Sequence, residues 1–155
     1  MKIALACDHG AFDHKEAIRE ELLKRGFEIE DFGCYSSASV DYPDTVYPAV
    51  KSVALGKNEF GVVLCGTGIG ASIVANKVKG IRCALVYDTQ TAAITREHNN
   101  TNVLAMGGRL VTPDEAVEIA LTWLNTLYPA DPRHQRRIDK ITAVEAKEGE
   151  HDERC

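Results

Sequence analysis

Residues 61–72, GVVLCGTGIGAS, decide how this chain folds. The apolar run 61–64 has the length and composition of a buried strand, and the glycine loop after it opens a segment of helical period at 71–78. A strand that passes through a loop into a helix is half of a β-α-β unit, in which the helix carries the chain back to start a parallel neighbour. The same alternation on both sides of this stretch would build a parallel sheet.

The alternation does continue in both directions along the chain. Gly26 is placed to stop the first helix, and Thr112, followed by a proline and two acids, is placed to start the last crossover helix. Because each parallel connection needs a covering helix, the sequence predicts an α/β fold, a Rossmann-like three-layer sandwich with a five-stranded parallel sheet. Strands are expected at 2–6, 27–32, 61–64, 81–87 and 102–106, and crossover helices at 13–25, 43–55, 71–78, 89–97 and 113–126.

The whole chain, 1–155, is expected to form a single domain. Apolar residues make up 45% of it and charged residues 26%, which is the balance of an ordinary globular domain. After Pro129 the composition becomes charged, and we expect an additional C-terminal helix within 131–147 that lies outside the sheet. Residues 148–155 are expected to fray.

The composition argues against several functional classes. A net charge of −5 offers no electrostatic footprint for a nucleic acid or an anionic membrane, and no apolar stretch is long enough to span a bilayer. The amino terminus does not resemble a secretory signal, and five widely spaced cysteines without a CxxC pair favour reduced thiols in the cytoplasm. Cys7, Cys34 and Cys83 are interpreted as small buried hydrophobes. No set of His, Asp and Glu indicates a metal site.

In an open parallel sheet, ligands bind beyond the carboxyl ends of the strands, where the loops lead into helices. The loop 65–70 is of special interest because it opens a helix, so that backbone N–H groups and the helix dipole converge on one spot suited to an anion. The loops expected at this edge are 7–10, 33–42, 65–70, 88 and 107–109.

The glycine loop also has two other interpretations. Gly66, Gly68 and Ala71 satisfy the dinucleotide-binding pattern, with Asp88 about twenty residues further on, so a non-catalytic nucleotide-binding module is an alternative. Against it, the loop follows the third strand rather than the first, and one short domain leaves little room for both a dinucleotide and a substrate. The simplest interpretation is a tight turn between a strand and a helix.

Reactive side chains flank this loop. Cys65 stands at the entrance of a helix, where a thiolate is stabilised, so it would serve as a base or nucleophile at neutral pH. Asp8 and His9, at the end of the first strand, offer a carboxylate and an imidazole that work on hydroxyl protons or hold a phosphate. The same pair equally suits the cap of the helix that follows.

Two further groups lie outside these loops. His98 belongs to a dense polar run just before the last strand, where an ordinary loop is the alternative interpretation. Arg133 and Arg137 are one helical turn apart, a spacing that suits two guanidinium groups on one phosphate. A solvated basic face is the alternative for these arginines, with Asp131, Asp139 and Glu145 as their ion-pair partners.

Taken together, these residues resemble ribose-5-phosphate isomerase of type B, in the wider family that includes the subunits of galactose-6-phosphate isomerase. One branch of that family has Gly at the position of Cys65 and a Glu base at the position of Ala71, so this chain resembles the cysteine branch. The likeness covers nearly the whole chain and is carried by Cys7-Asp8-His9, Asp41-Tyr42-Pro43, Cys65-Gly66-Thr67-Gly68, Ala75-Asn76-Lys77, Gly80-Ile81-Arg82, His98-Asn99, Thr101-Asn102-Val103-Leu104, Gly107 with Arg109, and Arg133-His134-Gln135 with Arg137.

The resemblance implies an aldose–ketose isomerase of the pentose phosphate pathway that needs no cofactor. It would interconvert ribose 5-phosphate and ribulose 5-phosphate by moving a proton between C1 and C2 through an enediolate. Cys65 would be the base, and Thr67 would orient the reacting hydroxyl. The anion hole for the enediolate oxygen would come from the loop amides of Gly66, Thr67, Gly68, Ile69 and Gly70.

The resemblance also implies roles for the remaining residues. His98 would open the sugar ring with help from Asp8, which also contacts the substrate. The phosphate would be held by His9, Arg133 and Arg137, and the sugar would be lined by Tyr42, Asn99 and Arg109. A six-carbon substrate, allose 6-phosphate or galactose 6-phosphate, stays open as an alternative.

The placement of His98 and Asn99 predicts that the site is shared between subunits. Both precede the last strand, at the opposite edge of the sheet from Cys65, and a five-residue strand is about 17 Å long. Such a distance is too great for a side chain of the same subunit, so we expect a homodimer with two composite sites, with pairing into a tetramer as a further option.

Overall fold

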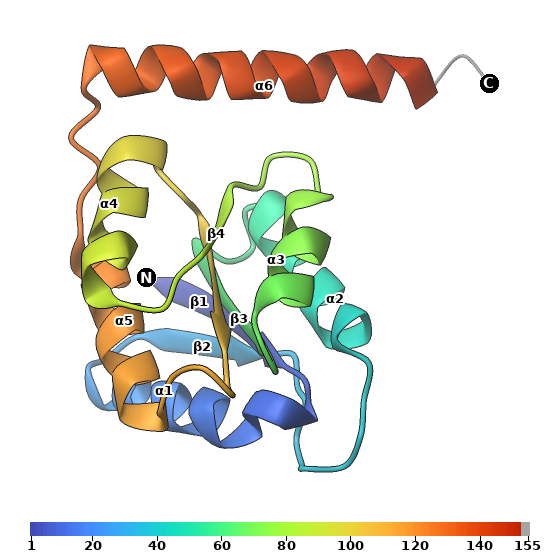
Figure 1. Cartoon of the computed structure of the whole chain (residues 1–155), viewed down its shortest axis with the longest axis vertical. Helices are drawn as coiled ribbons and strands as arrows, with labels where there is room; N and C mark the ends of the chain where they lie inside the picture. The colour runs from blue at the N-terminus through green and yellow to red at the C-terminus, as the bar shows by residue number, and fades with distance from the viewer. Residues whose placement is uncertain (153–155) are drawn as a thin grey trace.

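A five-stranded parallel sheet forms the middle layer of the molecule (Figure 1). The structure is a computed structural model that describes residues 1–152. Its strands pair in the order β2-β1-β3-β5-β4, and every pairing is parallel. The Rossmann-like fold predicted from the sequence is confirmed. The strands are β1 (Lys2–Cys7), β2 (Glu28–Asp31), β3 (Phe60–Cys65), β4 (Cys83–Leu85) and β5 (Val103–Gly107).

Helices cover both faces of the sheet, with α1, α4 and α5 on one face and α2 and α3 on the other (Figure 1). A 3₁₀ turn, His9–Ala11, leads into α1. The cap expected before α5 is present, because Thr112 and Glu115 form a reciprocal capping box. The helices are α1 (Phe12–Lys24), α2 (Tyr42–Ala54), α3 (Ile69–Asn76), α4 (Thr89–Asn99), α5 (Pro113–Asn125) and α6 (Pro132–Asp152).

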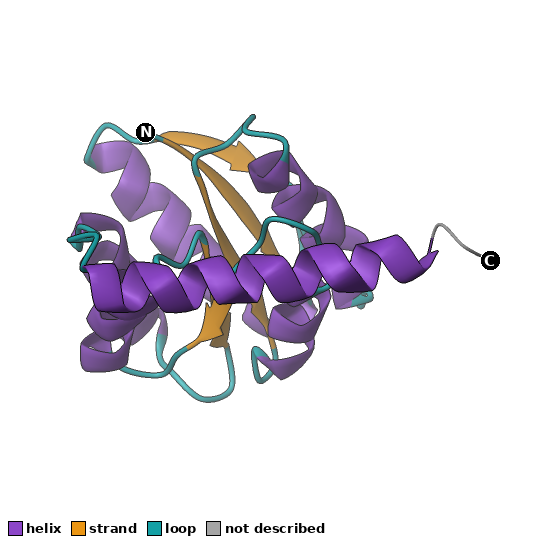
Figure 2. Ribbon diagram, turned by 90° about the horizontal axis from the view of Figure 1, so that it is seen from above, coloured by secondary structure: helices purple, strands orange, loops and turns teal. Residues whose placement is uncertain are grey.

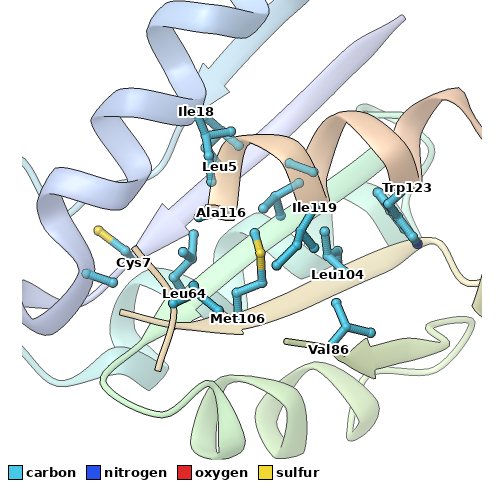
Figure 3. Packing of buried hydrophobic residues seen from close by; sticks show 14 of the residues in the cluster. Leu5, Cys7, Ile18, Leu64, Val86, Leu104, Met106, Ala116, Ile119 and Trp123 are labelled. Atoms are coloured by element: carbon cyan, nitrogen blue, oxygen red, sulfur yellow. The ribbon is translucent and has the colours of Figure 1, made fainter. Parts of the chain in front are cut away.

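The two faces of the sheet bury side chains of different size. Alternate residues of each strand point to opposite faces, so Leu5 and Leu64 meet α1 and α5 while Ala6 and Val63 meet α2 and α3. Figure 3 shows the first face, where large side chains such as Trp123 interlock with the strands. Burying each large apolar side chain contributes about 1.5–3 kcal/mol, so this face supplies much of the stability.

Two elements near the edge of the sheet differ from their expected bounds. Strand β4 is three residues long, shorter than the expected 81–87, because it is an edge strand that pairs with β5 alone. On its outer side the Cys83 backbone bonds to the Asn76 side chain instead of to a strand. Helix α3 begins two residues earlier than expected. Gly68 has a φ of 77° and serves as its N-cap, so the helix starts directly after the loop.

Helix α6 is longer than the sequence indicated. It begins at Pro132 and continues to Asp152, five residues beyond the expected end at 147, and residues 153–155 lie outside the described part. The fraying expected for 148–155 stays a prediction. The Gly80 amide donates to Glu145 Oε1 at 2.9 Å and ties the helix to the body. Figure 2 shows α6 crossing the molecule and projecting past it. A single glycine, Gly149, does not end so long a helix, because one glycine costs only about 1 kcal/mol.

The strands run away from α6, which lies at the amino-terminal edge of the sheet beside the end of α4 (Figure 1). The loops after β1, β3 and β5 therefore meet at the opposite, carboxyl-terminal edge. Within residues 1–152, no helix combines the length and the apolar character needed to cross a membrane.

Candidate active site

A pocket of about 440 Å³ opens at the carboxyl-terminal edge of the sheet. Strands β1 and β3 are neighbours, and Cys7 pairs with Leu64. Asp8 follows Cys7 and Cys65 follows Leu64, so these two residues lie side by side at the edge of the sheet. Many of the residues singled out in the sequence are brought together here. The pocket is lined by Asp8, His9, Gly10, Tyr42, Cys65, Gly66, Thr67, Ile69, Gly70, Ile73 and Arg109.

The Cys65 thiol lies at the floor of this pocket and is 4% exposed. Its Sγ accepts a hydrogen bond from the backbone N–H of Gly68 at 3.2 Å, which stabilises negative charge on the sulfur. The loop after Cys65 turns tightly because the backbone of Gly68 adopts the left-handed conformation. A Cβ there would lie 2.6 Å from the carbonyl carbon of Met106, so no larger residue fits.

The amides of the glycine loop divide into two groups. Those of Gly68 and Ile69 are engaged within the loop, on Cys65 Sγ and on Thr67 Oγ1. Among residues 1–152, the amides of Gly66, Thr67 and Gly70 donate to no protein acceptor. Free N–H groups at the start of a helix are suited to an oxyanion.

Two side chains close over the loop from other elements. The Tyr42 ring, at the start of α2, packs against Gly70, where an added Cβ would lie 2.6 Å from Tyr42 Oη. The Arg109 guanidinium lies over Gly66, where a Cβ would be 3.2 Å from Arg109 Cζ. The Arg109 amide also donates to the Gly66 carbonyl at 2.8 Å, so the turn after β5 holds this cation against the loop.

Asp8 and His9 both line the pocket and both hold local structure. Asp8 is 8% exposed, and its Oδ1 accepts a hydrogen bond from the Gly10 amide at 2.9 Å. It therefore caps the 3₁₀ turn, which agrees with the capping role that the sequence gave as an alternative. His9 Nδ1 lies 3.2 Å from the Val40 amide nitrogen and 3.3 Å from the Val40 carbonyl oxygen, so the tautomer decides whether it accepts or donates. With Nδ1 as acceptor, a neutral imidazole carries its proton on Nε2 and can donate it to a ligand.

His98 and Asn99 lie elsewhere, at the end of α4 on the amino-terminal edge. The His98 ring stacks on that of His134 in α6, with centroids 4.2 Å apart and planes at 17°. Arg133 Nη2 lies 3.2 Å from His134 Nε2. Burial lowers the pKa of His134, and the neighbouring His98 adds to this effect, so the neutral ring is favoured.

Arg133 and Arg137 are both exposed on α6, and neither forms an ion pair with any residue in 1–152. The three acidic residues expected to pair with these arginines on a solvated basic face accept hydrogen bonds from other groups instead. Asp131 accepts from the Arg133 backbone, Asp139 accepts from Gln135, and Glu145 accepts from Gly80. Both guanidinium groups are therefore available to an anion.

Several residues without a role predicted from the sequence lie at these two sites. Arg82 donates to the carbonyls of Asn99 and Asn100, at 2.9 and 2.7 Å, and so fixes the end of α4. His134 was named only among the residues that carry the family resemblance. Ile73 lines the pocket, and its spacing of four residues from Ile69 was the signal that could have found it.

The nucleotide-binding interpretation finds little support in the geometry. Asp88, which would have to reach a ribose, instead caps α4, because its carboxylate accepts from the Thr91 amide and hydroxyl. It is not among the residues that line the pocket. No group of three or more His, Cys, Asp and Glu residues within the described residues is arranged to hold a metal ion.

The chain is similar over nearly its whole length to known proteins. The family model described as Ribose/Galactose Isomerase matches residues 3–141. The putative sugar phosphate isomerase YwlF of Bacillus subtilis is 51% identical over 148 residues, which are 95% of this chain and 99% of that protein. The structure of ribose-5-phosphate isomerase B from Clostridium thermocellum matches with a TM-score of 0.92 and 44% identity, over 95% of this chain and 99% of that chain. That of the Mycoplasma genitalium enzyme of the same name, with bound ribulose-5-phosphate, matches with a TM-score of 0.89 and 39% identity, over 94% of this chain and 96% of that chain.

Proposed function

The chain belongs to the ribose/galactose isomerase family, and from this we propose that it interconverts ribose 5-phosphate and ribulose 5-phosphate with Cys65 as the base. It is a sugar-phosphate isomerase, an enzyme that moves a proton between two neighbouring carbons. One observation above all supports the choice of base. The Cys65 thiol lies on the floor of the pocket with a backbone N–H directed at its sulfur.

The residues around Cys65 can carry out the proton transfer. The thiolate takes the proton from C2 of the open-chain aldose and returns it to C1 of the enediolate. The free amides of Gly66 and Gly70 hold the enediolate oxygen, and each such donor contributes on the order of 3 kcal/mol to the transition state. The Thr67 hydroxyl orients the reacting hydroxyl, while Tyr42 and Arg109 close the pocket around the sugar.

Ring opening and phosphate binding need more groups than those that line this pocket. We assign ring opening to His98, assisted by Asp8, and phosphate binding to His9, Arg133 and Arg137, with Asn99 on the sugar. Since His98, Asn99 and the two arginines lie at the far edge of their own sheet, they would serve the pocket of a second copy of the chain. The working enzyme would then be a homodimer with two composite sites, and two dimers would make the tetramer that stays an alternative.

The size of the sugar depends on the space between the glycine loop and those arginines. Ribose 5-phosphate is the first choice because the relatives are named for it. Allose 6-phosphate and galactose 6-phosphate would need a slightly longer cleft and stay as alternatives. The buried, unpaired thiols suit the reducing cytoplasm, where we place this step of the pentose phosphate pathway.

A direct assay tests this proposal. The purified chain is incubated with ribose 5-phosphate, without added metal or nucleotide, and ribulose 5-phosphate is measured over time. We expect conversion up to the equilibrium ratio of the two sugars, and parallel assays with allose 6-phosphate and galactose 6-phosphate give the preference. Absence of product with all three sugars would refute the proposed activity.

A further inference from the structure

Two thiols that the proposed reaction does not use lie against each other beneath the active-site pocket. Cys7 Sγ and Cys34 Sγ are 3.7 Å apart, and both residues are buried, with exposed fractions of 0% and 5%. Backbone hydrogen bonds join the same segments, from the Cys7 amide to the Gly33 carbonyl at 2.6 Å and from the Cys34 amide to the Cys7 carbonyl at 2.8 Å. The backbone therefore holds the two side chains in contact.

This pair differs from the other described cysteines. Within residues 1–152, the contact between Cys7 and Cys34 is the only one in which two thiols lie within hydrogen-bonding distance, so Cys65 and Cys83 have no thiol that close. A disulfide needs an S–S distance of about 2.05 Å and Cα atoms within about 7 Å. Cys34 lies three residues beyond the end of β2, but its backbone hydrogen bonds to Cys7 continue the pairing of β1 with β2 to this point. Chain segments paired in this way lie about 4.8 Å apart, which is within that range. Side-chain rotation alone would then close the remaining gap.

We propose that Cys7 and Cys34 are a reversible oxidation site, at which a hydroperoxide converts the dithiol into an intramolecular disulfide. Cys34 is the thiol that is not fully covered, so it reacts first. Its sulfur attacks the peroxide, the O–O bond breaks, and a sulfenic acid and one water (or alcohol) form. Cys7 sulfur then attacks the sulfenic sulfur, the S–O bond breaks, and a second water leaves as the S–S bond forms. Two thiols are oxidised by two electrons and one peroxide is reduced.

The order of these steps agrees with the surroundings of each thiol. Burial, and next the adjacent Cys34, raises the pKa of Cys7, so Cys7 is the poorer first nucleophile. The disulfide would tie the end of β1 to the start of the connection that leads to Tyr42. Asp8 follows Cys7 directly, and the Thr45 hydroxyl donates to the Cys7 carbonyl at 2.9 Å, so the bond would form just below the pocket wall. This inference is independent of the sugar that the enzyme uses.

Peptide mapping of the natural chain tests the proposal. The reduced protein is treated with hydrogen peroxide, its remaining thiols are alkylated, and it is digested with trypsin. Cys7, Cys34, Cys65 and Cys83 fall in four separate tryptic peptides, 3–15, 26–51, 58–77 and 83–96. We expect a linked species of 3–15 and 26–51, lighter by two hydrogens than the sum of the two, which dithiothreitol removes. Recovery of Cys7 and Cys34 as alkylated thiols at a peroxide dose that has already oxidised Cys65 would overturn the proposal.

Variants distinguish the proposed Cys7–Cys34 disulfide from oxidation at the other cysteines. Cys34→Ser should abolish the linked species, while Cys83→Ser, the matched control, should leave it unchanged. In a Cys65→Ser background, oxidation should raise the melting temperature, because the bond closes a loop of the unfolded chain, and the added Cys34→Ser change should remove that rise. A linked species that contains 58–77 instead would show that Cys65 is the reacting partner and would reject the assigned pair.

Discussion

The two edges of the sheet carry different chemistry. The carboxyl-terminal edge has a buried thiol, free backbone amides and one arginine, all held by tight glycine packing. The amino-terminal edge has two stacked imidazoles and two exposed arginines on a helix that projects past the body. One edge can abstract a proton from carbon and hold an oxyanion. The other has two imidazole rings and two guanidinium groups, which suit proton transfer and phosphate binding.

The distance between the two edges limits how a complete site can be assembled. β5 runs between the two edges, and its five residues span about 17 Å. One sugar phosphate therefore cannot contact both edges of the same subunit's sheet. The backbone of the strands keeps the two edges this far apart in every side-chain conformation. A second copy of the chain, turned by a two-fold axis, would bring the amino-terminal edge of one subunit to the pocket of the other and the reverse at the second site.

The largest effect is expected at the carboxyl-terminal edge. Cys65→Ala should lower kcat by several orders of magnitude, because it removes the proposed base, while the fold and most of the affinity for ribose 5-phosphate remain. Steady-state kinetics with circular dichroism of the variant measure this. Cys83→Ala is the control and should keep normal turnover, since Cys83 lies on β4, away from the pocket. Near-normal kcat in Cys65→Ala would mean that another base does the work.

Mixing variants from the two edges tests whether they meet between subunits. Cys65→Ala and His98→Ala proteins should each be nearly inactive alone. Refolded together in equal amounts, half of the dimers are hybrids, and each hybrid has one site with both changes and one with neither. Random pairing should therefore restore roughly a quarter of wild-type activity. No recovery in a mixture that contains hybrids by mass spectrometry would place His98 and Cys65 in the same chain's pocket.

The arginines of α6 should affect binding more than turnover. Arg133→Ala or Arg137→Ala should raise KM for ribose 5-phosphate about tenfold or more, because a hydrogen bond to a charged group contributes about 1.5–3 kcal/mol. The already weak use of unphosphorylated ribose should stay unchanged. Arg136→Ala, on the same helix, is the matched control. An equal loss with both sugars would indicate that Arg133 and Arg137 support the structure instead.

Much of this arrangement could be predicted from local sequence. The alternation around residues 61–72 predicted the parallel sheet and the loops at its carboxyl-terminal edge. The pairing of β1 with β3, which puts Asp8 beside Cys65, was not predicted. Contacts between distant segments were the part that sequence patterns could not supply. The stack of His98 on His134 depends on where α6 lies, and the two bonds from Arg82 to the end of α4 depend on the path of the chain around Gly80. Both are tertiary contacts without any periodic signal.

The closing of the pocket by Tyr42 gives a smaller test of the carboxyl-terminal edge. Gly70→Ala should destabilise the protein by about 1–3 kcal/mol and lower kcat/KM, because the new methyl group collides with the Tyr42 ring. Chemical denaturation and kinetics measure the two effects. Tyr42→Ala removes the collision, so the double variant should be no less stable than Tyr42→Ala alone. Additive losses in the double variant would show that the ring does not press on Gly70.

The smallest expected effect is a dependence of stability on pH at the amino-terminal edge. Burial lowers the pKa of His134 in the folded chain, so the unfolded chain binds the proton more readily, and stability rises with pH. The destabilisation should begin as pH falls through about 6.5, the ordinary pKa of histidine, and should stop growing below the lowered folded value. We expect His134→Gln to melt with a shallower decline between pH 7 and pH 5 than the natural chain, and His14→Gln, away from α6, serves as the control. The stacked partner His98 and the nearby Arg133, Arg137 and Asp131 are unchanged in this variant, so a decline as steep as that of the natural chain would assign the pH effect to His98 or to another group and not to His134.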